Sequence, residues 1–242
     1  MQEVNIEENI SSSYTNVYYD YLPWAPAGYE QNIVLKKAMV EQPSWWKDLA
    51  PFYNGCKTVN EFMDKHEDDF WELNRNAVFA TSKRCPAIIG HFSNSIIIKS
   101  PCDIAIKIND DSFEWKAPGE KLYVDLHSGR QVGSLPYNIL KICLPIVIKS
   151  DPGTTASFIT PTLYNDLGYE LAPGVTDTNE VNQLHLIILV SKKKTTYFIP
   201  ADSVLAVMQF SKKVKNIVKG DLLQAHYERS WNSNKYIGKV RK

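Results

Sequence analysis

The feature that most constrains the fold is a series of short apolar segments in the last third of the chain. Residues 184–190, 195–199 and 203–210 are rich in isoleucine, valine, leucine and aromatic residues, and turn-forming residues separate them. Short apolar runs divided in this way are typical of β-strands joined by tight turns. The sequence therefore predicts an antiparallel β-meander over this region.

The middle of the chain repeats the pattern of short strands and turns. Strands are predicted at residues 88–92, 95–99, 104–108, 112–116, 122–126, 139–149 and 156–160. Asn109-Asp110-Asp111 and Pro118-Gly119 predict hairpin turns between neighbouring strands, because such residues accept the backbone conformations that tight turns require. Pro145 is expected to interrupt its strand, since proline cannot donate to the hydrogen-bond ladder.

Two regions carry a helical pattern instead. In residues 43–76 a proline-serine pair precedes two tryptophans, and Thr58 with Glu61 three residues later forms a capping-box arrangement. Residues 214–227 predict a helix near the C-terminus. The expected fold class is thus mainly β, with barrel-like or sandwich-like antiparallel sheets, a short helical insert at about residues 43–76 and a C-terminal helix.

We expect three parts along the chain. Residues 1–42 form an extended arm rich in aromatic residues and proline, residues 43–210 form the β-rich domain with its helical insert, and residues 211–242 form a basic, partly helical tail. The first thirty residues lean acidic and the last fifty lean basic. Solvated termini are one interpretation of this asymmetry, and docking of one end onto an acidic partner such as a neighbouring copy is the other.

Composition excludes several classes of function. Lys+Arg and Asp+Glu each number 27, so the formal net charge is zero and neither nucleic-acid nor membrane binding is indicated. The four cysteines include no CxxC pair, which favours buried thiols in a reducing compartment over a zinc site. No signal peptide or membrane-spanning run is present. We expect a soluble protein, cytoplasmic when made, without a cofactor or metal.

Aromatic and basic side chains supply the candidate binding residues. Trp24 and Tyr29 lie in a proline-rich segment, and Trp45 and Trp46 begin the helical insert. Their rings either pack on the parent domain or anchor into a partner, such as a copy of the chain or another assembly protein. The basic turn formed by Lys192, Lys193 and Lys194 is either an anion site or a solvated hairpin tip.

The stretch that begins near residue 171 resembles the second half of the dUTP pyrophosphatase and dCTP deaminase superfamily. Gly174-Val175-Thr176-Asp177 stands where those proteins have a glycine, two apolar residues and an aspartate, and residues 201–207 approximate their second motif. The resemblance implies a β-clip fold and a trimer. It also implies that Asp177 activates the water that attacks a nucleoside triphosphate bound to Mg²⁺.

The sequence departs from that superfamily at three places. Glu180 replaces the tyrosine that stacks under the deoxyribose, residues 151–155 lack the arginine of the phosphate motif, and the C-terminus lacks the glycine-rich arm. The combination of PSWWK, KRCPAIIG and DPGTTASF also looks like an uncharacterised family found largely in tailed phages. This resemblance implies a viral origin but no biochemical role, and a virion is then one expected location.

Common catalytic motifs are missing from the sequence. It contains no GxSxG, GxxxxGK[ST], HExxH or GxGxxG pattern. The first hypothesis is therefore a non-enzymatic assembly or structural protein, such as a phage virion or accessory component. The alternative is a nucleotide pyrophosphatase or nucleotide-binding protein that uses Asp177, and only this alternative calls for Mg²⁺.

Overall fold

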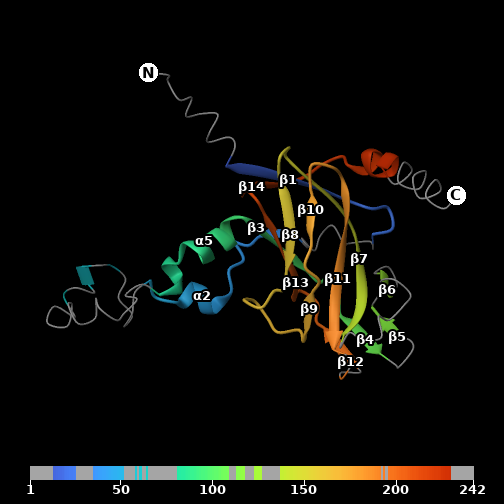
Figure 1. Ribbon diagram of the computed structural model, residues 1–242, viewed down its shortest axis with the longest axis horizontal. Coiled ribbons are helices and arrows are strands. Elements are labelled where there is room, and N and C mark those ends of the chain that lie inside the picture. Colours follow the sequence, from blue (N-terminus) through green and yellow to red (C-terminus); the bar gives the residue numbers. More distant parts are fainter. Residues whose placement is uncertain are drawn as a thin grey trace, which may run out of the picture.

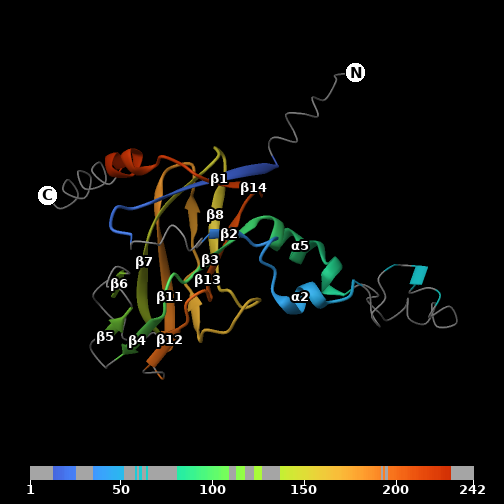
Figure 2. The same cartoon turned by 180° about the vertical axis from the view of Figure 1, so that it is seen from behind.

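The protein is mainly β and contains few helices (Figures 1 and 2). Within the described residues the strands form three sheets, and nearly all neighbouring strands run antiparallel. The computed structural model describes residues 13–25, 35–51, 58, 60, 61, 64, 81–108, 113–117, 123–126, 137–191, 193 and 196–229.

The largest sheet has six strands and contains both the first and the last strand of the described chain. Strand β6 pairs with β7, beside the main path of the sheet. The order along that path is β14 (Lys213–Lys219), β1 (Tyr14–Tyr21), β7 (Tyr137–Ser150), β11 (Asn182–Ser191) and β9 (Tyr169–Leu171), with β6 at Tyr123–Leu126.

Two further sheets complete the β-structure. The five-stranded sheet has the order β10 (Val175–Asp177), β8 (Thr155–Ile159), β13 (Val204–Phe210), β3 (Ser95–Lys99) and β2 (Leu35–Lys37). The three-stranded sheet has the order β12 (Thr196–Ile199), β4 (Ile104–Ile108) and β5 (Phe113–Lys116).

One hydrophobic cluster joins all three sheets, and two smaller clusters lie outside it. In β3, Ile96 and Ile98 belong to the central cluster, whereas Ile97 points into a second cluster with Trp46 and Phe92. A third cluster includes Val147 of β7. Alternate residues of these strands therefore enter different clusters, which explains why β3 and β7 are apolar almost throughout.

The helices cover outer faces of the sheets. Within the described residues, no helix has the length and apolar character that crossing a bilayer requires. Thr58 Oγ1 accepts a 3.1 Å hydrogen bond from the Glu61 N–H, which confirms the predicted N-cap. The described helical elements are α2 (Ser44–Asp48), η3 (Ser82–Arg84), α5 (Pro86–Ser93) and residues 223–229, and the single positions 60, 61 and 64 are helical as well.

Most of the predicted strands are confirmed, and so is the pairing of the two strands on either side of residues 109–111, which themselves lie outside the described residues. Strands β4 and β5 pair in antiparallel register from Ile108 opposite Phe113. The second predicted hairpin, with its turn at Pro118-Gly119, would pair β5 with β6. That pairing is wrong, because β6 pairs with β7 and β5 pairs with β4. The buried faces of the strands, and not a turn sequence alone, decide which partners they take.

The predicted β-meander over residues 184–210 is also wrong, although its three strands exist. Strand β11 pairs with β7 and β9, β12 pairs with β4, and β13 pairs with β3 and β8. The three consecutive strands thus belong to three different sheets. Each strand finds a partner that is distant in sequence and that buries its apolar face.

The segment predicted as a strand at residues 88–92 is part of helix α5. Pro86 occupies the first turn, where a proline is preorganised for a helix. Ile88 and Phe92, four residues apart, pack in the same cluster, and the Phe92 ring lies 5.1 Å from the Trp46 ring. The apolar spacing that matters here is therefore helical.

Pro145 does not interrupt β7. The ladder to β11 shifts register between Gln183 and His185, and the Gln183 side chain donates a 3.1 Å hydrogen bond to the Leu144 carbonyl. On the other side of the strand, the Leu22 N–H donates to the Pro145 carbonyl. A bulge and a side-chain donor thus accommodate the missing proline N–H.

The helix predicted for residues 214–227 is wrong in its first half. Residues 213–219 form β14, which pairs in parallel with β1, and only residues 223–229 are helical. Val214 and Ile217 pack against the central cluster from this strand. Strand β1 lies within the predicted N-terminal arm, yet it is an inner strand between β14 and β7.

A chain of buried hydroxyl groups holds β1, the β7–β8 turn and the β10–β11 turn together. Thr178 is fully buried, and its Oγ1 donates a 2.9 Å hydrogen bond to the Thr154 carbonyl. Thr178 Oγ1 also lies 2.5 Å from Ser150 Oγ, and Thr154 Oγ1 donates to Thr15 Oγ1 at 3.3 Å. These bonds satisfy polar groups that have lost contact with water.

We expect Thr178→Val to lower the free energy of unfolding by about 1–3 kcal/mol, because the Thr154 carbonyl and the Ser150 hydroxyl lose a buried partner. Denaturant unfolding measures the change. Thr162→Val is the matched control. Because Thr162 is exposed, this substitution is expected to change the free energy of unfolding by no more than about 0.5 kcal/mol. Equal losses in the two variants would contradict the role of the hydroxyl chain.

His91 makes stability depend on pH. Its Nε2 is buried without a hydrogen-bond partner, and burial lowers the pKa of His91 below its ordinary value of 6.5. The unfolded chain therefore binds a proton more readily than the folded chain, so stability falls as the pH drops through 6.5. We expect the wild type to lose more stability than His91→Gln between about pH 7.5 and about pH 5.5 in denaturant unfolding. Parallel pH profiles would contradict this.

Candidate functional site

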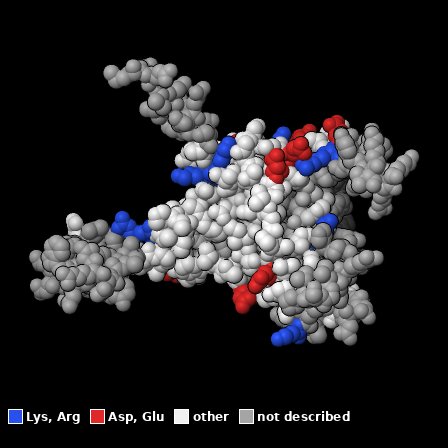
Figure 3. Space-filling model, in the orientation of Figure 1, with Lys and Arg blue, Asp and Glu red and all other residues white. Residues whose placement is uncertain are grey.

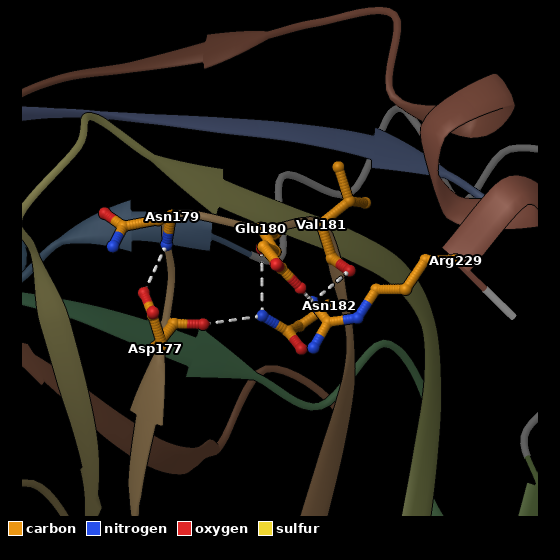
Figure 4. A network of polar contacts seen from close by, with 6 residues as sticks. All are labelled: Asp177, Asn179, Glu180, Val181, Asn182 and Arg229. Carbon is orange, nitrogen blue, oxygen red and sulfur yellow. Dashed lines mark hydrogen bonds and ion pairs between the residues drawn. The ribbon is translucent and has the colours of Figure 1, made fainter. Parts of the chain in front are cut away.

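The aspartate singled out by the superfamily resemblance lies at the end of β10 as an exposed turn residue (Figure 4). Asp177 Oδ1 accepts a 2.9 Å hydrogen bond from the Asn179 N–H, and the Asp177 carbonyl accepts a 2.8 Å bond from Asn182 Nδ2. An aspartate side chain that accepts from the N–H two residues later is the signature of an Asx turn. The carboxylate thus shapes the turn into β11.

The same turn contains an ion pair. Arg229, from the helix at residues 223–229, donates through Nη1 to the Val181 carbonyl at 3.1 Å and lies 3.0 Å from Glu180 Oε2 (Figure 4). Asn182 Nδ2 donates a further bond to the Glu180 carbonyl at 2.9 Å. Arg229 is therefore already bound to a carboxylate and a backbone carbonyl.

Asp151, at the start of the segment compared above with the phosphate motif, fastens β1 to the turn after β7. Its Oδ2 accepts bonds from the Asn16 N–H at 2.6 Å and from Asn16 Nδ2 at 2.9 Å, and its Oδ1 accepts from the Tyr18 hydroxyl at 3.1 Å. The hydrogen bond to Asp151 raises the pKa of Tyr18. Asp151 and Asp177 thus have separate partners in the described chain.

No metal site emerges from the part of the chain that the structure describes. Its histidines, cysteines and carboxylates form no group of three or more that could hold an ion. The surface drawn in Figure 3 has basic and acidic side chains at its periphery and a broad region between them without described charges.

The four predicted aromatic contact residues occupy different environments. Trp24 is 38% exposed and Trp45 is 44% exposed, whereas Trp46 is 2% exposed. Trp45 Nε1 donates a 2.7 Å bond to the Leu163 carbonyl, and Trp46 packs on Phe92 in the core. A partner could therefore reach Trp24 and Trp45, but not Trp46. Tyr29 lies outside the described residues.

The predicted basic turn is described at one position. Lys193 is exposed, and its backbone N–H donates to Ser191 Oγ at 3.3 Å as the chain leaves β11. Lys192 and Lys194 lie outside the described residues. The turn leads directly into β12, so Lys193 stands beside the three-stranded sheet.

The outer face of the three-stranded sheet forms a groove that the sequence patterns did not identify. Its volume is about 800 Å³. Phe198 of β12, Ala105 of β4 and Lys116 of β5 are paired in one cross-strand row, and Thr196, Lys107 and Glu114 are paired in the next. All six side chains are exposed, because their neighbours along each strand face inward.

The groove combines an apolar wall with two cations. Phe198 is 58% exposed, and its neighbour across the ladder is the small Ala105, which leaves a hollow beside the ring. Lys107 and Lys116 form no ion pair among the described residues. Alternation in β12 could have identified Phe198 as an outward aromatic residue. The pairing of β12 with β4, which creates the hollow, could not be found from local sequence.

Comparison with known proteins gives little further guidance. No family model and no curated protein matches the chain. Among solved structures, the chain is similar to native EIAV dUTPase, with a TM-score of 0.32 and 11% sequence identity. That similarity covers 50% of this chain and 76% of the dUTPase chain, and at this level it supports no conclusion about activity.

The two neighbouring tryptophans provide a test of the core and the surface around α2. We expect Trp46→Ala to lower the free energy of unfolding by about 3–5 kcal/mol, because it removes a large buried ring from the second cluster. Trp45→Ala, which removes a half-exposed ring from the adjacent position, is the control and should cost less than about half as much. Denaturant unfolding distinguishes the two, and a larger loss at Trp45 would contradict the packing.

Proposed function

We propose that this protein is a non-catalytic assembly protein that binds copies of itself or other assembly proteins, as a component or accessory of a larger particle such as a phage virion. The observation that carries the proposal is the groove on the outer face of β12, β4 and β5. It presents the exposed Phe198 beside the small Ala105, and Lys107 and Lys116 line the same face. An exposed aromatic residue next to a hollow is typical of the centre of a protein interface.

The hydrogen bonds that the carboxylates of Asp177 and Asp151 accept also support a binding role. A general base for hydrolysis must be free to accept a proton from water and must lie near the phosphates. Asp177 Oδ1 accepts from the backbone of its own turn and Asp151 accepts from Asn16 and Tyr18, so the two carboxylates share no partner among these bonds. Lys193 and Arg229 do not contact either carboxylate among the bonds of the described chain.

The proposal predicts association that depends on concentration. Light scattering over a range of protein concentrations should show the average mass rising above that of one chain. We expect Phe198→Ser to weaken association at least about tenfold, because aromatic residues in such positions carry much of the binding free energy. Tyr227→Ser removes another exposed aromatic ring, 50% exposed on the helix at residues 223–229, and is expected to change association less than about threefold.

The same preparations test the alternative function. Incubation with dUTP and Mg²⁺ is expected to release no pyrophosphate, and Asp177→Asn should leave both association and this result unchanged. Pyrophosphate release that Asp177→Asn abolishes would overturn the proposal in favour of a nucleotide pyrophosphatase. A chain that stays monomeric at all concentrations and also fails to bind assembly proteins would overturn it as well.

A further inference from the structure

The groove on the three-stranded sheet has a spacing of apolar and cationic positions that an extended peptide can match. Ala105 and Lys107 are two residues apart on β4 and both face outward. Alternate residues of a strand lie about 6.7 Å apart. A peptide lying along β4 in extended conformation therefore brings an apolar side chain over Ala105 and, two residues on, a second side chain over Lys107.

The chain itself contains a segment of that composition. Its first twelve residues, MQEVNIEENISS, carry three glutamates and no lysine or arginine. Ile6 and Glu8 are two residues apart, so in an extended peptide they share a face, with Val4 on the same side. Ile6 matches the hollow between Phe198 and Ala105, and Glu8 then matches Lys107.

The electrostatic balance favours the same occupant. Lys107 and Lys116 outnumber Glu114 on the outward face, and the exposed Lys193 precedes β12. An acidic side chain gains attraction next to Lys107 or Lys116, whereas a basic side chain there would lie next to a lysine. The apolar hollow in turn favours a protein segment with a branched aliphatic side chain over a ligand that offers charge alone.

The positions of the two elements suit a contact between two copies. The acidic segment joins the fold just before Tyr14 of β1, which lies with β14 at one end of the molecule, while β12, β4 and β5 lie at the opposite end (Figures 1 and 2). Twelve extended residues reach about 40 Å from their attachment point. A segment that leaves one end of a molecule is well placed to reach the groove of the next.

We propose that residues 3–8 of one copy dock in extended conformation along β4 in the groove of a second copy, with Ile6 over Ala105 and Glu8 beside Lys107. This inference rests on the proposed function, since it names the partner of the same groove. The contact is head-to-tail, because the two surfaces that meet are different. Such contacts form closed assemblies, including a dimer in which each copy's segment enters the other's groove, or open chains.

A charge swap in the full-length chain tests the contact. Lys107→Glu and Glu8→Lys should each weaken association about tenfold, because each one places like charges together. The double variant, Glu8→Lys with Lys107→Glu, should return to within about threefold of the wild type. Sedimentation velocity over a range of concentrations measures the association constant, and the single-variant losses should shrink from about 50 mM to about 300 mM salt.

Matched controls separate the contact from general charge and folding effects. Lys215→Glu makes the same charge change on β14, away from the groove, and should alter association less than about threefold. Lys107→Glu puts two carboxylates opposite each other in the ladder to Glu114, so thermal unfolding is measured alongside. Lys107→Gln avoids that repulsion and should still weaken association about threefold.

The outcomes distinguish this inference from the proposed function. If Phe198→Ser weakens association but the double variant does not recover it, the inference is overturned and the assembly function stands. The inference would be overturned in the same way if a single-stranded oligonucleotide or an unrelated protein bound at Lys107 and the double variant did not recover self-association. A chain that is monomeric throughout overturns the inference, and assembly with other proteins then decides the proposed function.

Discussion

The structure depends on strands that are buried on both faces. Ile96 and Ile98 enter the central cluster from β3 while Ile97 enters the cluster under α2 and α5, and β7 behaves in the same way with Val147 facing Leu222. Apolar residues on both faces of such a strand contribute burial, at roughly 25 cal/mol per Å² removed from water. The short helices are therefore part of the core, because they cover the second face of the sheets.

Local sequence was sufficient to identify most strands but not their partners. The segments at residues 95–99, 104–108 and 139–149 have the β-branched composition of strands and are strands in the structure. Residues 88–92 contain the same residue types, yet Pro86 and the packing of Phe92 on Trp46 make them helical. Pairing depends on which faces become buried, and that information comes from residues far away in the sequence.

At the candidate site, too, local sequence identified individual residues but not the contacts that they make. The sequence identified Asp177 by its motif, but its hydrogen bonds to Asn179 and Asn182 depend on how the turn closes. The groove was not foreseen, because Phe198 and Ala105 become neighbours only when β12 pairs with β4. The alternation of each strand nevertheless indicates which side chains line the groove. Phe198 and Lys107 face outward, whereas Tyr197 and Ile106 face the core.

The parallel pairing of β1 with β14 affects how the chain can be made. Tyr14 lies opposite Lys213, so β1 lacks one of its two neighbouring strands until synthesis has passed residue 219. Its other neighbour, β7, must also be synthesised before any part of β1 can be paired. A nascent chain on the ribosome therefore carries an unpaired aromatic strand for most of its synthesis. Folding is expected to be slow and to begin from hairpins such as β4–β5, with the sheet that contains both β1 and β14 completed last.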